Sequence, residues 1–245
     1  MDLRFERKYL VPNNQLNEFR NRMQPFLLPD VMAKSEKGAF PEYTVRSIYF
    51  DSPVFNSYYE KVEGYKMRKK LRIRGYNNYE PGCKVFLEIK RKLENNITKN
   101  RALVPFDSLQ DLLETSDIEK YVPKEYNSPA AIEDAERFFY NLKRYSQKPT
   151  NLVVYEREPY HGKFDPGVRL TLDKNVRASI QPKINDLYNE EGLVYLWEKF
   201  FILEIKYFTP VMPRWARSLV EEFKLKHAAL SKYTTGMDGQ QFVFH

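Results

Sequence analysis

Acidic and basic side chains alternate with apolar ones along several short segments of this chain. A glutamate and a lysine stand two residues apart on three of them. These pairs are Glu6 with Lys8, Glu88 with Lys90, and Glu204 with Lys206. Arg72 and Arg74 form an Arg-x-Arg pair on a fourth segment. Successive side chains of a β-strand point to opposite faces, so residues two apart share a face. The spacing therefore predicts strand faces dominated by cations and interrupted by single carboxylates.

Cations gathered in this way predict an anionic ligand with many oxygen atoms. Two like charges about 6 Å apart repel by roughly 3 kcal/mol at an effective dielectric of about 20. An oligophosphate relieves this repulsion, because Arg binds phosphate oxygens with two parallel hydrogen bonds and Lys acts as a point charge. Carboxylates among the cations suit Mg²⁺ or Mn²⁺, which bridges carboxylate and phosphate oxygens. The pattern thus indicates a triphosphate or polyphosphate site with a divalent metal.

Period-two alternation along the whole chain indicates a β-rich fold. It predicts eight strands, at Phe5–Val11, Thr44–Phe50, Lys70–Tyr76, Lys84–Lys92, Lys99–Val104, Leu152–Arg157, Gly167–Asp173 and Phe200–Tyr207. Apolar residues at helical spacing and capping residues predict helices between them. These are Asn14–Met23, a short helix opened by Asp51-Ser52-Pro53 and closed by Gly64, Ser128–Tyr145, and a last helix opened by Pro213. The segment Asn175–Glu198 is expected to be an irregular loop.

The polar faces have two interpretations. They could be the solvated side of an antiparallel sheet. However, they are dominated by cations with isolated glutamates, whereas solvated faces mix Thr, Ser, Gln and Asn with charges. If the sheet closes on itself, one face lines a tunnel and the other packs against helices. We therefore expect an α+β fold in one domain, residues 1–245, with about eight antiparallel strands closed into a tunnel and helices packed outside.

Composition narrows the function further. The formal net charge of +7 favours anionic partners. Cys83 is the single cysteine, which excludes an internal disulfide or Cys-based zinc site. The sequence has no Walker motif or Gly-rich dinucleotide loop, so side chains must bind the phosphates. Few aromatics lie on the basic faces, which weighs against nucleic acid. A signal peptide and a membrane span are both lacking, so a cytoplasmic location is expected.

A set of short segments combines apolar and charged residues in a fixed order along the chain. These segments are Phe5–Val11, Ser47–Ser52, Leu71–Tyr76, Phe86–Arg91, Val168–Asp173, Ile202–Lys206 and Leu230–Thr234. The ordered set resembles the triphosphate tunnel metalloenzyme superfamily. Within it, the set resembles the VTC domain, the catalytic domain of vacuolar transporter chaperone polyphosphate polymerases. The resemblance covers about Arg4 to Gly236.

The resemblance implies a set of phosphate contacts and metal ligands. The phosphate contacts are Lys8, Arg72, Arg74, Lys90, Lys99, Arg157, Arg169, Lys206 and Lys232. Among them, the expected catalytic residues are Arg72, Arg74, Lys90, Arg157 and Lys206. Glu204 is the first choice as metal ligand, before Glu6 and Glu88. Tyr155 shares a face with Arg157 and is either a substrate contact or a packing residue.

The chain departs from the family pattern at two positions. Arg4 stands where the superfamily's first Glu-x-Glu glutamate would be, which argues against a two-metal hydrolase. Ala229 replaces a lysine of the fungal polymerases, and Lys226 is a candidate substitute. The sequence lacks the phosphate-sensing SPX domain and the membrane anchor of the fungal proteins. A membrane or regulatory partner, if the protein has one, is therefore expected to be a separate protein.

The resemblance implies ATP-dependent synthesis of polyphosphate with Mn²⁺ or Mg²⁺. Two alternatives stay open. One is an inorganic triphosphatase or related phosphohydrolase that uses the same tunnel. The other is a non-catalytic protein that binds polyphosphate or RNA.

Overall fold

The computed structural model describes residues 5–31, 33, 40–94 and 96–241. It divides into two compact units, each assembled from three stretches of the chain. The first unit comprises Met1–Thr44, Tyr155–Val176 and Tyr195–Ser231, and the second comprises Val45–Val154, Arg177–Val194 and Lys232–His245. Two long strands, β7 (Lys148–Gly162) and β8 (Arg169–Ile180), contribute residues to both units. That the whole chain is one domain stays a prediction.

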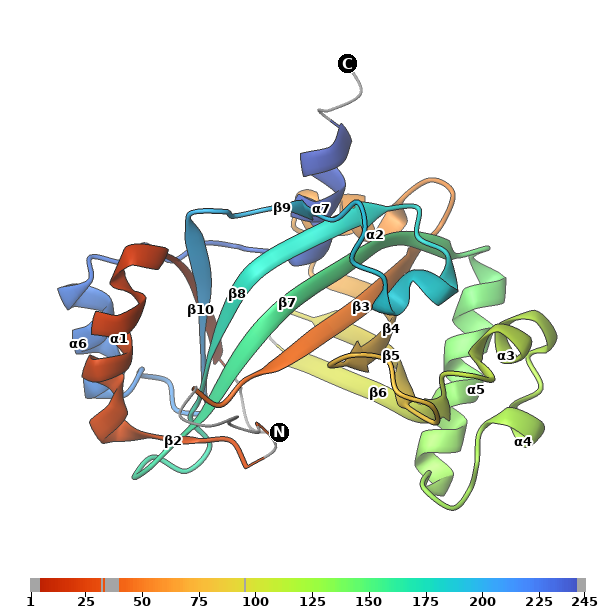
Figure 1. Ribbon diagram of the computed structural model, residues 1–245, viewed down its shortest axis with the longest axis horizontal. Helices are drawn as coiled ribbons and strands as arrows, with labels where there is room; N and C mark the ends of the chain where they lie inside the picture. The colour runs from red at the N-terminus through yellow and green to blue at the C-terminus, as the bar shows by residue number, and fades with distance from the viewer. Residues whose placement is uncertain (1–4, 32, 34–39, 95, 242–245) are drawn as a thin grey trace. The chain divides into compact units, whose positions relative to one another are not determined.

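Ten strands form one sheet, with the order β1-β10-β8-β7-β3-β4-β5-β6, while β2 pairs with β7 and β9 pairs with β8 (Figure 1). Their bounds are β1 Phe5–Pro12, β2 Leu27–Pro29, β3 Tyr43–Asp51, β4 Met67–Tyr76, β5 Lys84–Leu93, β6 Asn96–Pro105, β9 Val194–Tyr195 and β10 Phe200–Tyr207. The pairs β1–β10, β10–β8, β2–β7, β3–β4, β4–β5 and β5–β6 are antiparallel. The predicted antiparallel α+β class is therefore confirmed. Over the described residues the order of paired strands is open, so backbone pairing does not close the sheet into a barrel.

Helices pack beside the strands within each unit. The first unit contains α1 (Leu16–Met23) and α6 (Arg214–Glu222), with 3₁₀ turns at Asn13–Gln15 and Gln24–Phe26. The second contains α2 (Asn56–Val62), α3 (Leu109–Thr115), α4 (Ile118–Tyr121), α5 (Pro129–Arg144), a 3₁₀ turn at Ile184–Tyr188 and α7 (Lys232–Gln241). Ser128 caps α5 by accepting a hydrogen bond from the Ala131 N–H, and Pro129 follows it as predicted.

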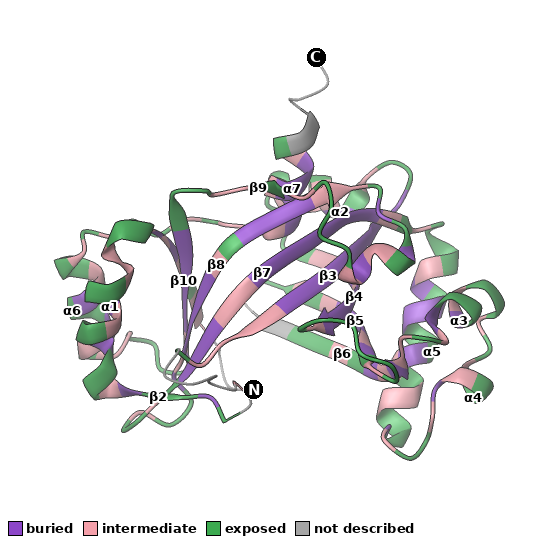
Figure 2. Ribbon diagram, viewed as in Figure 1, coloured by how far each residue is buried: buried purple, intermediate pink, exposed green. Residues whose placement is uncertain are grey.

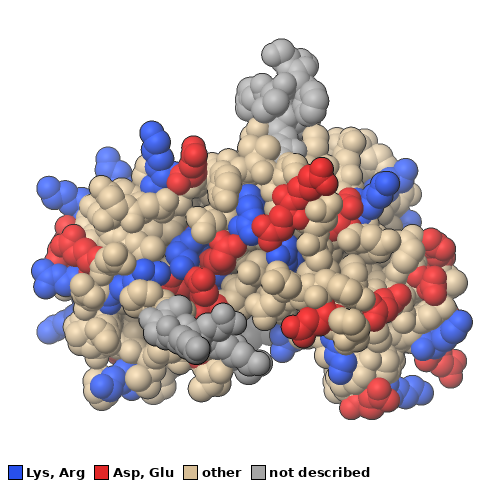
Figure 3. All heavy atoms as spheres, viewed as in Figure 1, with Lys and Arg blue, Asp and Glu red and all other residues tan. Residues whose placement is uncertain are grey.

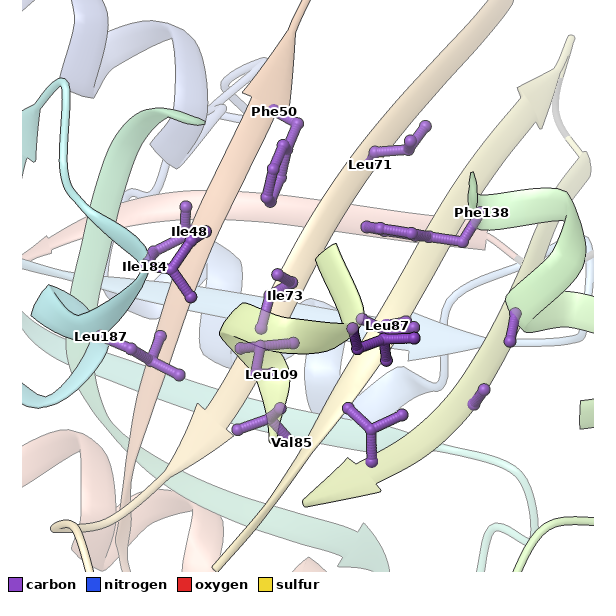
Figure 4. Close-up of a cluster of buried hydrophobic side chains, with 14 of the residues drawn as sticks. Ile48, Phe50, Leu71, Ile73, Val85, Leu87, Leu109, Phe138, Ile184 and Leu187 are labelled. Atoms are coloured by element: carbon purple, nitrogen blue, oxygen red, sulfur yellow. The ribbon is translucent and has the colours of Figure 1, made fainter. Parts of the chain in front are cut away.

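Each unit has its own hydrophobic core. In the first unit, α1 and α6 lie side by side (Figure 1). Phe19 of α1 packs edge-on against Phe201 of β10 and Phe223. In the second unit, the apolar faces of β3, β4 and β5 meet α3, α5 and the 3₁₀ turn at Ile184–Tyr188 (Figure 4). The side chains of Leu71, Ile73 and Leu87 are at most 1% exposed there. These cores fix one face of each strand and leave the charged face opposite.

The structure corrects three expectations about element bounds. The segment Asn175–Glu198 is not wholly irregular, because β8 continues to Ile180 with Val176 and Ala178 buried. The helix that opens at Pro213 is not the last one, since α7 follows it. The helix expected from Pro53 begins at Asn56, and the αL backbone of Phe55 (φ 54°) precedes it.

Candidate phosphate and metal site

The charged face of the second unit places three lysines in one row across neighbouring strands. Lys70 of β4 lies directly opposite Lys90 of β5, and Lys90 lies directly opposite Lys99 of β6. Like charges placed opposite each other destabilise a sheet. Glu88 offsets part of this repulsion through its ion pair with Lys99, and an anion bound along the row would offset more of it.

The next row toward the β4–β5 turn alternates in charge. Arg72 lies opposite Glu88, and Glu88 lies opposite Arg101. Glu88 is 1% exposed. Its Oε2 accepts a hydrogen bond from Arg72 Nε at 2.7 Å and lies 3.9 Å from Arg74 Nε. Lys99 Nζ also forms an ion pair with Glu88. One buried carboxylate thus holds three cations of this face in place.

Burial and neighbouring charges shift the pKa values of Glu88 and Lys99. Burial opposes the charge of Glu88, but Arg72, Arg74 and Lys99 outweigh it and lower its pKa to about 2. Burial lowers the pKa of Lys99 to about 8, although Glu88 partly opposes this change. Glu88 is therefore fully charged near neutral pH, and Lys99 begins to lose its proton just above it.

Strand β3 and helix α7 complete this side of the second unit. Ser47 and Tyr49 lie opposite Arg74 and Arg72, respectively. Arg74 Nε donates a hydrogen bond to Ser47 Oγ at 3.2 Å, and Arg72 Nη1 donates one to Tyr49 Oη at 3.1 Å. At α7, which begins at Lys232, the Tyr233 hydroxyl donates to Asp51 Oδ2 at 2.5 Å. The group defined as the cationic cluster comprises Ser47, Tyr49, Lys70, Arg72, Arg74, Glu88, Lys90, Lys99 and Lys232.

The charged face of the first unit forms a checkerboard. Glu6 lies opposite Lys206, and Lys8 lies opposite Glu204, across the β1–β10 pair. Lys8 Nζ is 3.1 Å from Glu6 Oε1 and 3.3 Å from Glu204 Oε2. Lys206 forms ion pairs with the same two glutamates. Burial opposes the charge of Lys8, but Glu204 and Glu6 raise its pKa above the ordinary value, whereas burial dominates at Lys206 and lowers its pKa.

Two further arginines of the first unit are held by aspartates. Arg157 of β7 donates to both oxygens of Asp173 of β8, from Nε at 2.6 Å and from Nη2 at 2.8 Å. Its guanidinium carbon lies 5.2 Å from the centre of the Tyr155 ring. Arg169 Nη2 donates to Asp30 Oδ2 at 3.0 Å. The group defined as the balanced cluster comprises Glu6, Lys8, Asp30, Tyr155, Arg157, Arg169, Thr171, Asp173, Glu204 and Lys206.

The balanced cluster fits a divalent metal better than the cationic cluster does. Glu6 and Glu204 contact the same lysine nitrogen, so their carboxylates lie close together. Thr171 lies opposite Glu204 on β8, and its hydroxyl oxygen is buried without a hydrogen-bond partner among the described residues. Over the same residues, no group of three or more His, Cys, Asp or Glu could hold a metal by itself. Two carboxylates completed by substrate phosphates and water match the usual Mg²⁺ environment.

Every predicted site residue falls in one of the two clusters. Lys8, Tyr155, Arg157, Arg169, Lys206, Glu6 and Glu204 belong to the balanced cluster, and Arg72, Arg74, Lys90, Lys99, Lys232 and Glu88 to the cationic cluster. That they all bind one substrate stays a prediction. Sequence reasoning missed Tyr49 and Asp30. Tyr49 could have been found, because it alternates with the apolar Ile48 and Phe50 in the segment Ser47–Ser52 and so lies on the opposite, polar face of the strand.

Burial argues against a simple solvated face. Arg74 is 7% exposed, Glu204 5% and Asp173 0%, and Figure 2 shows buried residues along these strands. Burying charges is costly unless they are paired or bind an ion. On the face drawn in Figure 3, by contrast, Lys and Arg lie interspersed with Asp and Glu. In the part of the chain that the structure describes, no helix has the length and apolar character needed to cross a membrane.

A known protein family matches most of the chain. The family model described as the VTC domain matches residues 3–239. No curated protein sequence matches the chain. Similar solved structures include a putative adenylyl cyclase from Hippeastrum described as having a dominant triphosphatase activity (12% identity, 96% of this chain and 95% of that chain, TM-score 0.48). Another is the PH1819 protein from Pyrococcus horikoshii OT3 (16% identity, 96% and 100%, TM-score 0.45). Both TM-scores are below 0.5, so these two likenesses carry no further argument.

Proposed function

Because the chain belongs to the VTC domain family, we propose that it is a polyphosphate polymerase that transfers the terminal phosphoryl group of ATP to a growing polyphosphate chain. Family membership supports action on a triphosphate or polyphosphate. The observation that carries the proposal is the lysine row Lys70–Lys90–Lys99 beside Arg72 and Arg74. A phosphate chain supplies repeated negative charge along such a row.

The charge balance of the cationic cluster supports a multiply charged substrate. Among its strand residues, Glu88 is the acidic member and Lys70, Arg72, Arg74, Lys90 and Lys99 are the basic ones. Arg forks position phosphate oxygens, whereas Lys adds charge without fixed geometry. Glu88 already orients Arg72 through the 2.7 Å hydrogen bond, so the Arg72 guanidinium group is held in place before substrate binds.

The transfer needs no covalent intermediate on the protein. A terminal oxygen of the polyphosphate attacks the γ-phosphorus of ATP and forms a new P–O bond. The bond from the γ-phosphorus to the β–γ bridging oxygen breaks, and ADP leaves with that oxygen. The attacking phosphate oxygen is already ionised, so no general base is required. In the second unit, Arg72, Arg74 and Lys90 would offset the negative charge in the transition state.

We assign the divalent metal to Glu6 and Glu204. When bound, Mn²⁺ or Mg²⁺ would neutralise phosphate oxygens and orient the transferring group. Lys8 and Lys206 each contact both carboxylates. Glu88 is a weaker candidate ligand, because three cations, Arg72, Arg74 and Lys99, surround this single carboxylate. The cytoplasmic location and a regulatory or membrane partner stay predictions.

A triphosphatase is the second candidate. The observation that favours it is Glu6, whose side chain keeps 18% of its surface exposed beside Lys8. Such a carboxylate could accept a proton from an attacking water. A binding protein without activity is the third reading, and the paired carboxylates Glu6 and Glu204 oppose it, since they would repel a phosphate backbone in the absence of a metal.

The test is a product assay with ATP and Mn²⁺, run with and without a short polyphosphate primer. The polymerase should release ADP and build phosphate chains that are resolved on a polyacrylamide gel. A primer requirement would fit the loss of a lysine at Ala229. Equimolar ADP and free phosphate without chains, in both conditions, would establish the hydrolase instead. Retention of polyphosphate on a column with neither product would leave only a binder.

A matched pair of variants tests the metal assignment. Glu204→Gln should abolish turnover while tripolyphosphate binding without metal is nearly unchanged. Glu133→Gln serves as the control, because the Glu133 side chain is 61% exposed on α5, outside both clusters. Normal turnover in Glu204→Gln would show that Glu204 is not a required metal ligand.

A further inference from the structure

A tyrosine lies among the arginines of the cationic cluster. Tyr49 is 8% exposed and lies directly opposite Arg72 across the β3–β4 pair. Its hydroxyl accepts a hydrogen bond from Arg72 Nη1 at 3.1 Å. Its ring centre is 5.2 Å from that of Tyr233 of α7 and 5.7 Å from the Arg72 guanidinium carbon. The phenol is therefore held in one position by strand pairing, ring packing and a charged donor.

The hydroxyl still has its own proton to donate. A phenol both accepts and donates hydrogen bonds, and the bond from Arg72 uses only its accepting side. Among the described residues, no acceptor for the Tyr49 proton is found. The charged groups around it are cations, namely Arg72 and Arg74 of β4 and Lys232 of α7, and the Tyr233 hydroxyl donates to Asp51 instead. An anion bound by these cations would supply the acceptor that the protein does not.

We propose that the Tyr49 hydroxyl donates a hydrogen bond to the phosphate group that Arg72 and Arg74 bind, so that this phosphate position is occupied tightly only while Tyr49 keeps its proton. This inference rests on the proposed phosphate-chain substrate. It adds a residue that binds substrate and a proton-linked control of that binding. A purely structural tyrosine would need its hydroxyl only to accept the hydrogen bond from Arg72 and would not need the proton.

The charges around Tyr49 bring the loss of its hydroxyl proton close to neutral pH. Burial raises the pKa of Tyr49, but Arg72 and Arg74 outweigh burial and lower it to about 8. A bound phosphate adds negative charge and reverses that effect, so binding near pH 8 should take up a proton. Above this pH the tyrosinate repels phosphate and cannot donate. Affinity should therefore fall as the pH rises through about 8.

The experiment compares wild type with Tyr49→Phe, which removes the hydroxyl and keeps the buried ring. Tripolyphosphate binding is measured by calorimetry without metal, at about pH 7 and pH 9, in two buffers of different ionisation enthalpy. We expect Tyr49→Phe to bind about tenfold more weakly at pH 7 and to lose part of the proton uptake at pH 8. Lys99 titrates in the same range in both proteins, so the difference between them isolates Tyr49. Tyr9→Phe is the control, because Tyr9 is a buried tyrosine of the first unit.

A second measurement does not depend on a variant. At pH 8, adding tripolyphosphate to wild type should decrease the ultraviolet absorption of tyrosinate, since Tyr49 is the described tyrosine whose pKa is lowered. Unchanged affinity and proton uptake in Tyr49→Phe, or no loss of tyrosinate absorption, would overturn the inference and leave the proposed function intact. No binding of tripolyphosphate by wild type would overturn both.

Discussion

Replacing Glu88 by Gln should destabilise the protein strongly in the absence of phosphate. The buried carboxylate compensates Arg72, Arg74 and Lys99, and the substitution leaves these cations close together with no anionic partner from β5. Its pKa falls from the ordinary 4.5 to about 2. At 1.36 kcal/mol for each tenfold change in acidity, this difference is equivalent to about 3 kcal/mol of folding free energy. Removing one partner of a buried ion pair costs about 3–5 kcal/mol in other proteins, which agrees.

The assay is urea unfolding of wild type, Glu88→Gln and the exposed control Glu133→Gln. A lowered carboxyl pKa stabilises the folded state above the unfolded-state value of about 4.5, and this contribution is lost as the pH falls toward about 2. The difference between wild type and Glu88→Gln should therefore be full at pH 7 and smaller at pH 3. Tripolyphosphate should stabilise Glu88→Gln more than wild type, because it replaces the missing negative charge. A Glu88→Gln protein as stable as Glu133→Gln at pH 7 would refute this account of the cluster.

Two further predictions concern the same cations. Tripolyphosphate should raise the melting temperature more than sulfate at equal ionic strength, and saturation to a hundred times its dissociation constant should add about 2.7 kcal/mol; equal shifts with both anions would contradict a site for a phosphate chain. Arg74→Ala should weaken tripolyphosphate binding by about 1.5–3 kcal/mol, whereas Arg137→Ala, on the exposed side of α5, should leave the calorimetric affinity unchanged.

The faces of the strands could be predicted from the sequence because burial follows the alternation closely. Leu71 and Ile73 are fully buried, while Arg72 and Arg74 between and beside them face the charged side. Helix α7 was missed for an equally physical reason. It contains two glycines, Gly236 and Gly239, and two threonines, residues with low helix propensity, so its helical state depends on tertiary packing. Tyr233 at its start is 2% exposed and bonds to Asp51.

The roles of the glutamates could not be predicted from their spacing, because strand register decides them. Glu88-x-Lys90 and Glu204-x-Lys206 look alike in the sequence. In the first unit, register places Glu6 opposite Lys206 and Lys8 opposite Glu204, so opposite charges pair and both carboxylates contact the same lysine nitrogen.

In the second unit, Glu88 and Lys90 have the same Glu-x-Lys spacing, but register places like charges beside each other in the row of Lys90. Register places arginines on both sides of Glu88 and lysines on both sides of Lys90, so one carboxylate is surrounded and one row is left purely cationic. A shift of one residue in pairing would turn every side chain of a strand to the other face. Strand register therefore determines whether the glutamate of a Glu-x-Lys pair lies opposite a lysine, as Glu204 does, or opposite arginines, as Glu88 does.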